Sequence, residues 1–168
     1  MQITGTSLLL FILPIVCVAL ILAASLHDIV ARTIPNSLSL ALAIAGIATG
    51  AQDGHLFGSL LTAGAVFVLS ALCWRRGWMG GGDVKLLGAA ALGMPPGSVL
   101  LFVAAVAIAG GLLALFYLAA RRLVPAPAAL RPDGLFARAL RVERWRISRG
   151  GPLPYACAIA AGALFVNV

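Results

Sequence analysis

Charged side chains are scarce in this chain. Only 10% of its 168 residues are Asp, Glu, Lys or Arg, whereas 62% are hydrophobic. An average soluble domain has roughly 25% charged residues, so this composition excludes a soluble globule. A membrane-spanning helix needs about 20 apolar residues, and the chain has room for about six. We therefore expect an all-α, polytopic membrane helix bundle that forms one domain over residues 1–168.

Cysteine and histidine are also rare. The three cysteines are far apart, no C-x-x-C pair is present, and no histidine cluster accompanies them. Zinc sites and disulfide frameworks need closely spaced or paired ligands. We therefore predict neither, and no cofactor. The cysteines are expected to be small hydrophobic packing residues, at Cys17, Cys73 and Cys157.

Long apolar runs separated by charge, glycine and proline predict six membrane spans. The first has no Lys or Arg before it and is longer than the core of a signal peptide, so we expect it to be retained. The fourth is short, because ten helical residues rise only about 15 Å. It is kept because the charge pattern fails without it. The expected spans are 7–26, 37–50, 57–73, 84–93, 98–120 and 152–168.

Basic residues fall on one side of this topology. With both termini outside, the inside segments are 27–36, 74–83 and 121–151, and the outside loops hold no Lys or Arg. Cytoplasmic loops retain Lys and Arg, so this bias sets the orientation. It also explains the net charge of +7 without nucleic acid, and it makes anionic lipid head groups the expected partners. The basic residues are Arg32, Arg75, Arg76, Lys85, Arg121, Arg122, Arg131, Arg138, Arg141, Arg144, Arg146 and Arg149.

The longest loop, 121–151, allows two interpretations. Prolines interrupt its first part, and Asp133 is placed to cap a helix whose apolar and basic residues separate onto two sides. That pattern fits an amphipathic helix lying at the membrane surface. Glu143 and Arg146 interrupt the apolar side, so an ordinary solvated basic loop fits as well.

Acidic residues are the scarcest charged type, and position separates them into two groups. Asp53, Asp133 and Glu143 lie in loops, where solvation accounts for them. Asp28 and Asp83 each adjoin an apolar span at the same membrane face, where a carboxylate is costly and is a candidate for function.

Each of these two aspartates has a simpler interpretation on its own. Asp28 fits a helix-end acid paired with Arg32, before a helix stop at Pro35 and a cap at Asn36 or Ser37. Asp83 fits an N-cap after a flexible turn.

Together, the two aspartates predict a catalytic pair. The glycines at 80–82 allow close approach of a ligand or second chain and φ angles that other residues avoid. Spans one and four of a small bundle can bring Asp28 and Asp83 together at one face. Neighbouring carboxylates then share a proton, so that one acts as a base on water and the other as an acid toward the scissile carbonyl.

At these residues the sequence resembles the type 4 prepilin peptidases, a family of bacterial inner-membrane aspartyl proteases. Residues 80–83 resemble the family's G-x-G-D motif, and residues 34–36 are similar to the I-P-N that follows its first aspartate. The resemblance implies that Asp28 and Asp83 are catalytic. The residues that support the two motifs are Gly80, Gly82, Lys85, Pro35 and Asn36.

The last span adds to the resemblance and also departs from it. Pro154-Tyr155 and Gly162 are similar to the family's closing P-[FY]-G segment, but Ala156 stands where glycine is common. We expect this departure to affect packing more than chemistry. Bifunctional members carry two C-x-x-C pairs in a cytoplasmic insertion and methylate the new pilin N-terminus. This chain lacks those pairs, so methyltransferase activity is not expected.

The resemblance implies a particular substrate. The chain is similar to the short, protease-only form associated with tight-adherence (Flp-type) pili. Such enzymes remove a short basic leader from prepilins or pseudopilins at the cytoplasmic face of the inner membrane. Two other hypotheses stay open: an aspartyl protease with another membrane substrate, and a small transporter or scaffold in which the aspartates bind a cation or proton. A transporter would be expected to place its acids near the midplane and to show an internal repeat, and neither is evident in the sequence.

Overall fold

The structure is a computed structural model that describes residues 5–123, 134, 141–142, 144–145 and 153–167. Every element in this part of the chain is helical, which confirms the all-α prediction for it. The helix expected after Asp133 falls largely outside the described residues. The elements are α1 (Gly5–Ala31), α2 (Asn36–Gln52), α3 (Leu56–Arg75), α4 (Gly81–Leu92), the 3₁₀ turn η1 (Pro96–Ser98), α5 (Val99–Leu123) and α7 (Tyr155–Asn167).

Three of the described helices are long and apolar enough to cross a membrane. They contain the segments Ile12–Ala31, Leu56–Arg75 and Pro96–Leu123. The chain is therefore built as a membrane protein. The remaining helices, α2, α4 and α7, have 17, 12 and 13 residues. At about 1.5 Å per residue they are shorter than a bilayer core, so the six-span topology stays a prediction.

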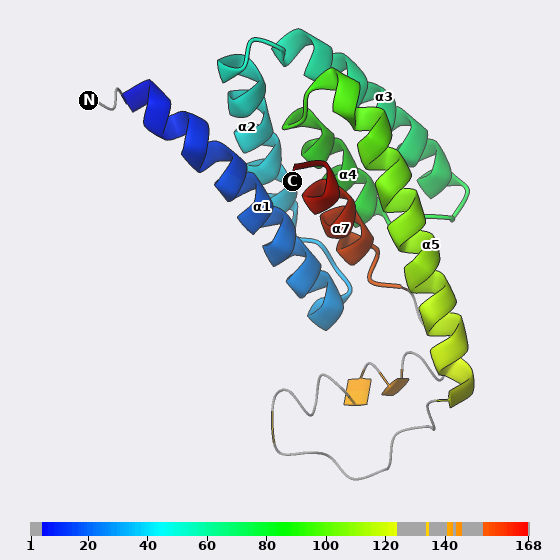
Figure 1. The fold of residues 1–168 in the computed structure, drawn as a ribbon. Helices are drawn as coiled ribbons and strands as arrows, with labels where there is room; N and C mark the ends of the chain where they lie inside the picture. Colours follow the sequence, from blue (N-terminus) through cyan, green and yellow to red (C-terminus); the bar gives the residue numbers. More distant parts are fainter. Residues whose placement is uncertain (1–4, 124–133, 135–140, 143, 146–152, 168) are drawn as a thin grey trace.

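The shortest of the described α-helices, α4, lies at the centre of the bundle. Helix α4 contacts α1, α2, α3 and α7, and α7 in turn packs against α1 and α5. In Figure 1, α4 and α7 lie between α1 on one side and α5 on the other. Along α4, Val84 and residues 86–91 are all buried. A helix enclosed by others does not have to match the bilayer thickness by itself, which explains how α4 can be short.

Small residues bring the central helices into close contact. A Cβ atom on Gly46 of α2 would lie 2.8 Å from the backbone nitrogen of Gly93, at the end of α4. A Cβ on Gly162 of α7 would lie 2.5 Å from Cγ2 of Val106 on α5. Close backbone approach through glycine is a common way to associate helices where lipid removes the hydrophobic driving force.

Two helix boundaries differ from the sequence prediction. Helix α1 ends at Ala31 rather than at the proline, and Arg32 takes a left-handed φ of 55°, a conformation that often closes a helix. Pro35 then occupies the N-cap position of α2. The prediction that Asn36 or Ser37 caps this helix is therefore wrong, because both lie in its first turn.

Candidate active site

Asp28 and Asp83 line the same cavity, which has a volume of about 300 Å³. The cavity lies between the end of α1, the loop that follows it, and the start of α4. Its wall includes most of the residues that the two sequence motifs predict. The lining residues are Asp28, Arg32, Thr33, Ile34, Asn36, Gly80, Gly81, Gly82, Asp83 and Lys85.

Asp28 lies in the last turn of α1 and is only 6% exposed. It belongs to the helix itself, two residues further along the chain than the predicted span reaches. Its Oδ2 accepts a hydrogen bond of 3.3 Å from the backbone N–H of Ala156. That N–H belongs to the first turn of α7, where backbone donors have no partner within the helix and the dipole favours an anion.

The contact between α1 and α7 is reinforced one turn earlier. The Ser25 hydroxyl lies 2.9 Å from the carbonyl oxygen of Ile21 and 2.9 Å from that of Ala156. Both Ser25 and Ala156 are buried. Ala156 thus contacts Asp28 and Ser25 through its main chain.

Asp83 is the third residue of α4 and is half-buried. The N-cap of this helix is Gly80, so the alternative in which Asp83 is itself the N-cap is wrong. Instead, the Asp83 carboxylate accepts the backbone N–H of Gly80, as the acid of a capping box does. This bond orients the side chain toward the cavity.

Burial and a neighbouring charge shift the ionisation of Asp83. Removal of the carboxylate from water is the larger cause, and the negative charge of Asp28 is the second; together they raise the pKa of Asp83 from 3.8 to about 6. The hydrogen bond from Gly80 acts in the opposite direction and is the smaller effect. The two carboxyl groups are therefore close enough to influence one another.

The glycines at 80–82 provide space and not unusual backbone angles. None of them has a positive φ, so this part of the sequence prediction is wrong. A Cβ on Gly80 would lie 2.7 Å from Oδ2 of Asp83. A Cβ on Gly82 would lie 3.2 Å from Cβ of Ile34, in the loop after α1. Two of the three glycines thus keep the carboxylate and the neighbouring loop in place.

The two sequence motifs contact each other directly. Lys85 Nζ donates a hydrogen bond of 2.9 Å to Asn36 Oδ1, and both side chains are exposed. Together with the Gly82–Ile34 contact, this bond joins the start of α4 to the start of α2. Four of the five motif-supporting residues that the sequence predicts thus line the cavity with the two aspartates, and the fifth, Pro35, is the N-cap of α2.

Sequence reasoning missed three contributors to the site. Ser25 and the Ala156 N–H were not predicted, because nothing in the sequence says which helix end faces Asp28. The third is His27, whose Nδ1 lies 2.7 Å from the carbonyl oxygen of Thr33 and so ties the loop after α1 back onto the helix. Its position next to Asp28 in the sequence was the one signal that could have indicated a role for His27.

A second polar cluster lies in the α2–α3 connection, at the other end of the bundle (Figure 1). His55 Nε2 is 3.5 Å from Asp53 Oδ2, and His55 Nδ1 is 2.8 Å from Ser59 Oγ. The Ser59 hydroxyl also donates a 2.9 Å hydrogen bond to the carbonyl oxygen of Met94. Among the described residues, no group of three His, Cys, Asp or Glu side chains is arranged to hold a metal ion.

Comparison with protein families gives a match over most of the described helices. The model of the type IV leader peptidase family matches residues 15–115, more than half of the chain, and this segment includes both aspartates. Neither the curated proteins nor the solved structures compared with the chain give a match.

Proposed function

Because the chain belongs to the type IV leader peptidase family, we propose that it is an aspartic endopeptidase with Asp28 and Asp83 as its catalytic pair. One observation carries this proposal: the two carboxyl groups line one cavity, and the charge of Asp28 raises the pKa of Asp83. Two carboxyl groups that share one proton can supply both a base and an acid. The family match supports peptidase chemistry, and the shared cavity supports the choice of Asp28 and Asp83 as the catalytic pair.

In the proposed reaction, Asp28 begins as the carboxylate and Asp83 holds the proton. Asp28 takes a proton from a water molecule in the cavity, and the water oxygen bonds to the scissile carbonyl carbon. Asp83 gives its proton to the carbonyl oxygen, which produces a neutral gem-diol. The C–N bond then breaks, the nitrogen takes the proton from Asp28, and one diol hydroxyl returns a proton to Asp83. Both groups regain their starting states.

The assignment of roles follows from the surroundings of each carboxyl group. Asp28 accepts the N–H of Ala156 at the start of α7, and an ionised carboxylate is a pure acceptor. Asp83 has a pKa raised to about 6, so it is the member assigned the proton, which it keeps at and below about pH 6. Its side chain meets the cavity next to the glycine turn, where an extended peptide can approach.

The proposed substrate is a prepilin or pseudopilin of the tight-adherence (Flp) type, which carries a short polar leader before an apolar helix. In the proposed topology, six spans place both termini outside and the aspartates at the cytoplasmic face of a bacterial inner membrane. The fourth crossing then begins just past Asp83. The basic residues at the ends of α1, α3 and α5 support this orientation, since they gather at the end of the bundle that holds the cavity. Anionic lipid head groups are their proposed partners.

The experiment that tests the proposal is cleavage of a synthetic precursor in proteoliposomes. The precursor has a short basic leader followed by an apolar helix of about 20 residues. We expect wild type to cut at the junction, and Asp28→Asn and Asp83→Asn each to lose activity by about a thousandfold or more. Asp53→Asn, at the other end of the bundle, is the matched control and should keep wild-type activity. Normal cleavage by either Asp28→Asn or Asp83→Asn would rule out the catalytic pair.

A further inference from the structure

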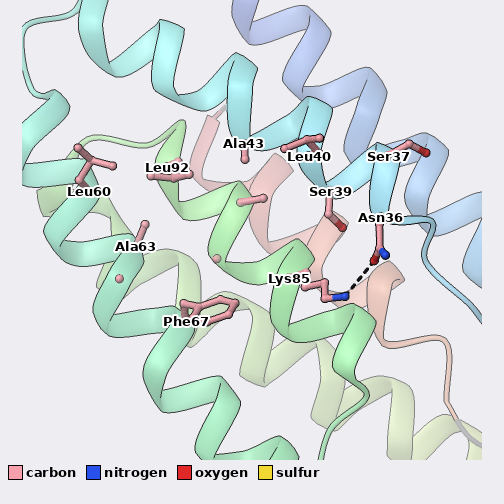
Figure 2. Close-up of a pocket in the computed structure, with 13 residues that line it drawn as sticks. Asn36, Ser37, Ser39, Leu40, Ala43, Leu60, Ala63, Phe67, Lys85 and Leu92 are labelled. Atoms are coloured by element: carbon pink, nitrogen blue, oxygen red, sulfur yellow. Dashed lines mark hydrogen bonds between the residues drawn. The ribbon is translucent and has the colours of Figure 1, made fainter.

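A second and larger hollow lies beside the catalytic cavity. It is an apolar groove of about 640 Å³ between α2, α3 and α4, shown in Figure 2. Most of its wall is hydrocarbon or backbone. The residues that line it are Asn36, Ser37, Ser39, Leu40, Ala43, Leu60, Ala63, Gly64, Phe67, Lys85, Gly88, Ala89 and Leu92.

The groove is lined by small residues and by larger apolar ones. Ala63 and Gly64 from α3, and Gly88 and Ala89 from α4, line the groove with small side chains or none; Gly64 is exposed, and Phe67 packs over Gly88. Leu40, Leu60 and Phe67 are exposed large hydrophobic residues on its flanks. In membrane proteins, stripes of small residues let a further helix approach closely. The shape therefore suits an apolar helix.

The groove and the catalytic cavity share part of their walls. Asn36 and Lys85 line both, and the hydrogen bond between them marks the junction (Figure 2). Lys85 is two residues from Asp83 in the first turns of α4. A chain whose scissile bond lies at the carboxylates can thus continue into the groove without crossing another helix.

We propose that this groove binds the apolar helix that follows the scissile bond of the substrate. The proposal rests on the proposed function, and it adds how the enzyme recognises a precursor. A substrate with a polar leader and an apolar helix would place its leader outside the cavity and its helix along α2 and α3. The enzyme then recognises the apolar helix that directly follows the scissile bond, and the charge of the leader contributes less to recognition.

Two glycines in open positions allow a matched test. A Cβ on Gly64 or on Gly111 would meet no atom within 4 Å. Gly64 lines the groove, whereas Gly111 lies exposed on α5, outside it. Leucine at position 64 is therefore expected to narrow the groove, since its Cβ meets no neighbour, and leucine at position 111 adds the same side chain elsewhere.

The expected result is a change in KM that depends on the substrate. With the synthetic precursor, Gly64→Leu should raise KM by about tenfold or more, Gly64→Ala by less, and Gly111→Leu should change it by under about twofold. A short soluble peptide that ends soon after the scissile bond should be cut by all of these variants at the wild-type rate. That second substrate also shows that the variants fold.

A photo-crosslink supplies a readout that does not need turnover. In an Asp83→Asn background, benzoylphenylalanine placed at Phe67 should crosslink to the precursor helix, and the same residue at the exposed Phe116 of α5 should not. An unchanged KM for Gly64→Leu, or crosslinks to lipid alone at Phe67, would overturn the groove proposal while leaving the catalytic pair intact. Failure of wild type to cut either substrate would overturn both proposals.

Discussion

Two polar clusters lie at opposite ends of the bundle, with similar residue types and different surroundings (Figure 1). At one end, Asp28 and Asp83 line a cavity of about 300 Å³. At the other end, Asp53, His55 and Ser59 have the composition of a serine-hydrolase triad. Ser59, however, is completely buried.

The direction of the hydrogen bonds separates the two clusters further. Ser59 donates its only proton to the carbonyl oxygen of Met94, so the 2.8 Å contact with His55 Nδ1 requires the histidine to be the donor. A base that already holds a proton on that nitrogen cannot activate the serine. Asp53 also lines a cavity, of about 210 Å³, but Ser59 does not. Exposure of both reacting groups to one cavity and a proton in the right place, rather than residue types, thus distinguish the candidate active site from a structural cluster.

Apart from the two aspartates, the largest effect is expected at Gly80. Substitution by alanine puts a Cβ 2.7 Å from Oδ2 of Asp83, so the carboxylate has to move. Because a displacement of about 1 Å in a catalytic group can cost about a hundredfold in rate, Gly80→Ala should lower kcat by that order. Gly81→Ala, whose Cβ faces the Trp74 ring, should lose much less. Equal losses of kcat in Gly80→Ala and Gly81→Ala would show that the contact with the Asp83 carboxylate is not the cause.

The pH dependence should show a smaller, graded effect. The proposed acid is protonated Asp83, whose pKa is about 6, so kcat/KM for cleavage should fall about tenfold per pH unit above that value. The folded protein binds this proton more tightly than the unfolded chain does, because the pKa of Asp83 is 3.8 when the chain is unfolded. The contribution of Asp83 to stability therefore decreases as pH rises from 3.8 to about 6.

Thermal unfolding checks the sign of this linkage. The melting temperature of wild type should fall as pH rises over that interval, and that of Asp83→Asn should fall less. The variant therefore becomes more stable relative to wild type at neutral pH. A rate profile that stays flat from pH 6 to pH 8 would contradict the shared proton.

The link between the two motifs should have a moderate effect. The Lys85–Asn36 hydrogen bond lies on exposed side chains, so Asn36→Ala and Lys85→Ala should each lower kcat/KM only about fivefold. In a double-mutant cycle the double variant should be no slower than the slower single variant. Fully additive losses would mean that the two residues act separately.

The smallest effect on catalysis is expected in the second cluster. Ser59→Ala removes the bond from α3 to the Met94 carbonyl and should lower the free energy of unfolding by about 1 kcal/mol. The rate of precursor cleavage by Ser59→Ala and by His55→Ala should stay within about twofold of wild type. If either variant folds but no longer cleaves the precursor, the second cluster also takes part in catalysis, and the contrast between the two ends of the bundle is wrong.

Sequence patterns predicted the helices and the aspartates better than the contacts between them. Apolar runs predicted all six described α-helices, because the apolar character of a run can be read from the sequence without knowledge of the fold. Flanking motifs singled out Asp28 and Asp83, which line one cavity in the structure. The helix end at Ala31 and the position of Asp83 inside α4 could not be predicted, because capping depends on backbone geometry. The Ala156 N–H on Asp28 joins residues 128 apart in the chain, which no local pattern reports.

The central claim is that Asp28 and Asp83 act as one unit, and a comparison of single and double variants tests it most directly. Cleavage of the synthetic precursor is measured for Asp28→Asn, Asp83→Asn and the double variant in the same proteoliposomes. Residues that act together give non-additive losses, so each single variant should be about as slow as the double variant. Losses that multiply in the double variant, or a single variant that cleaves at the wild-type rate, would contradict the account.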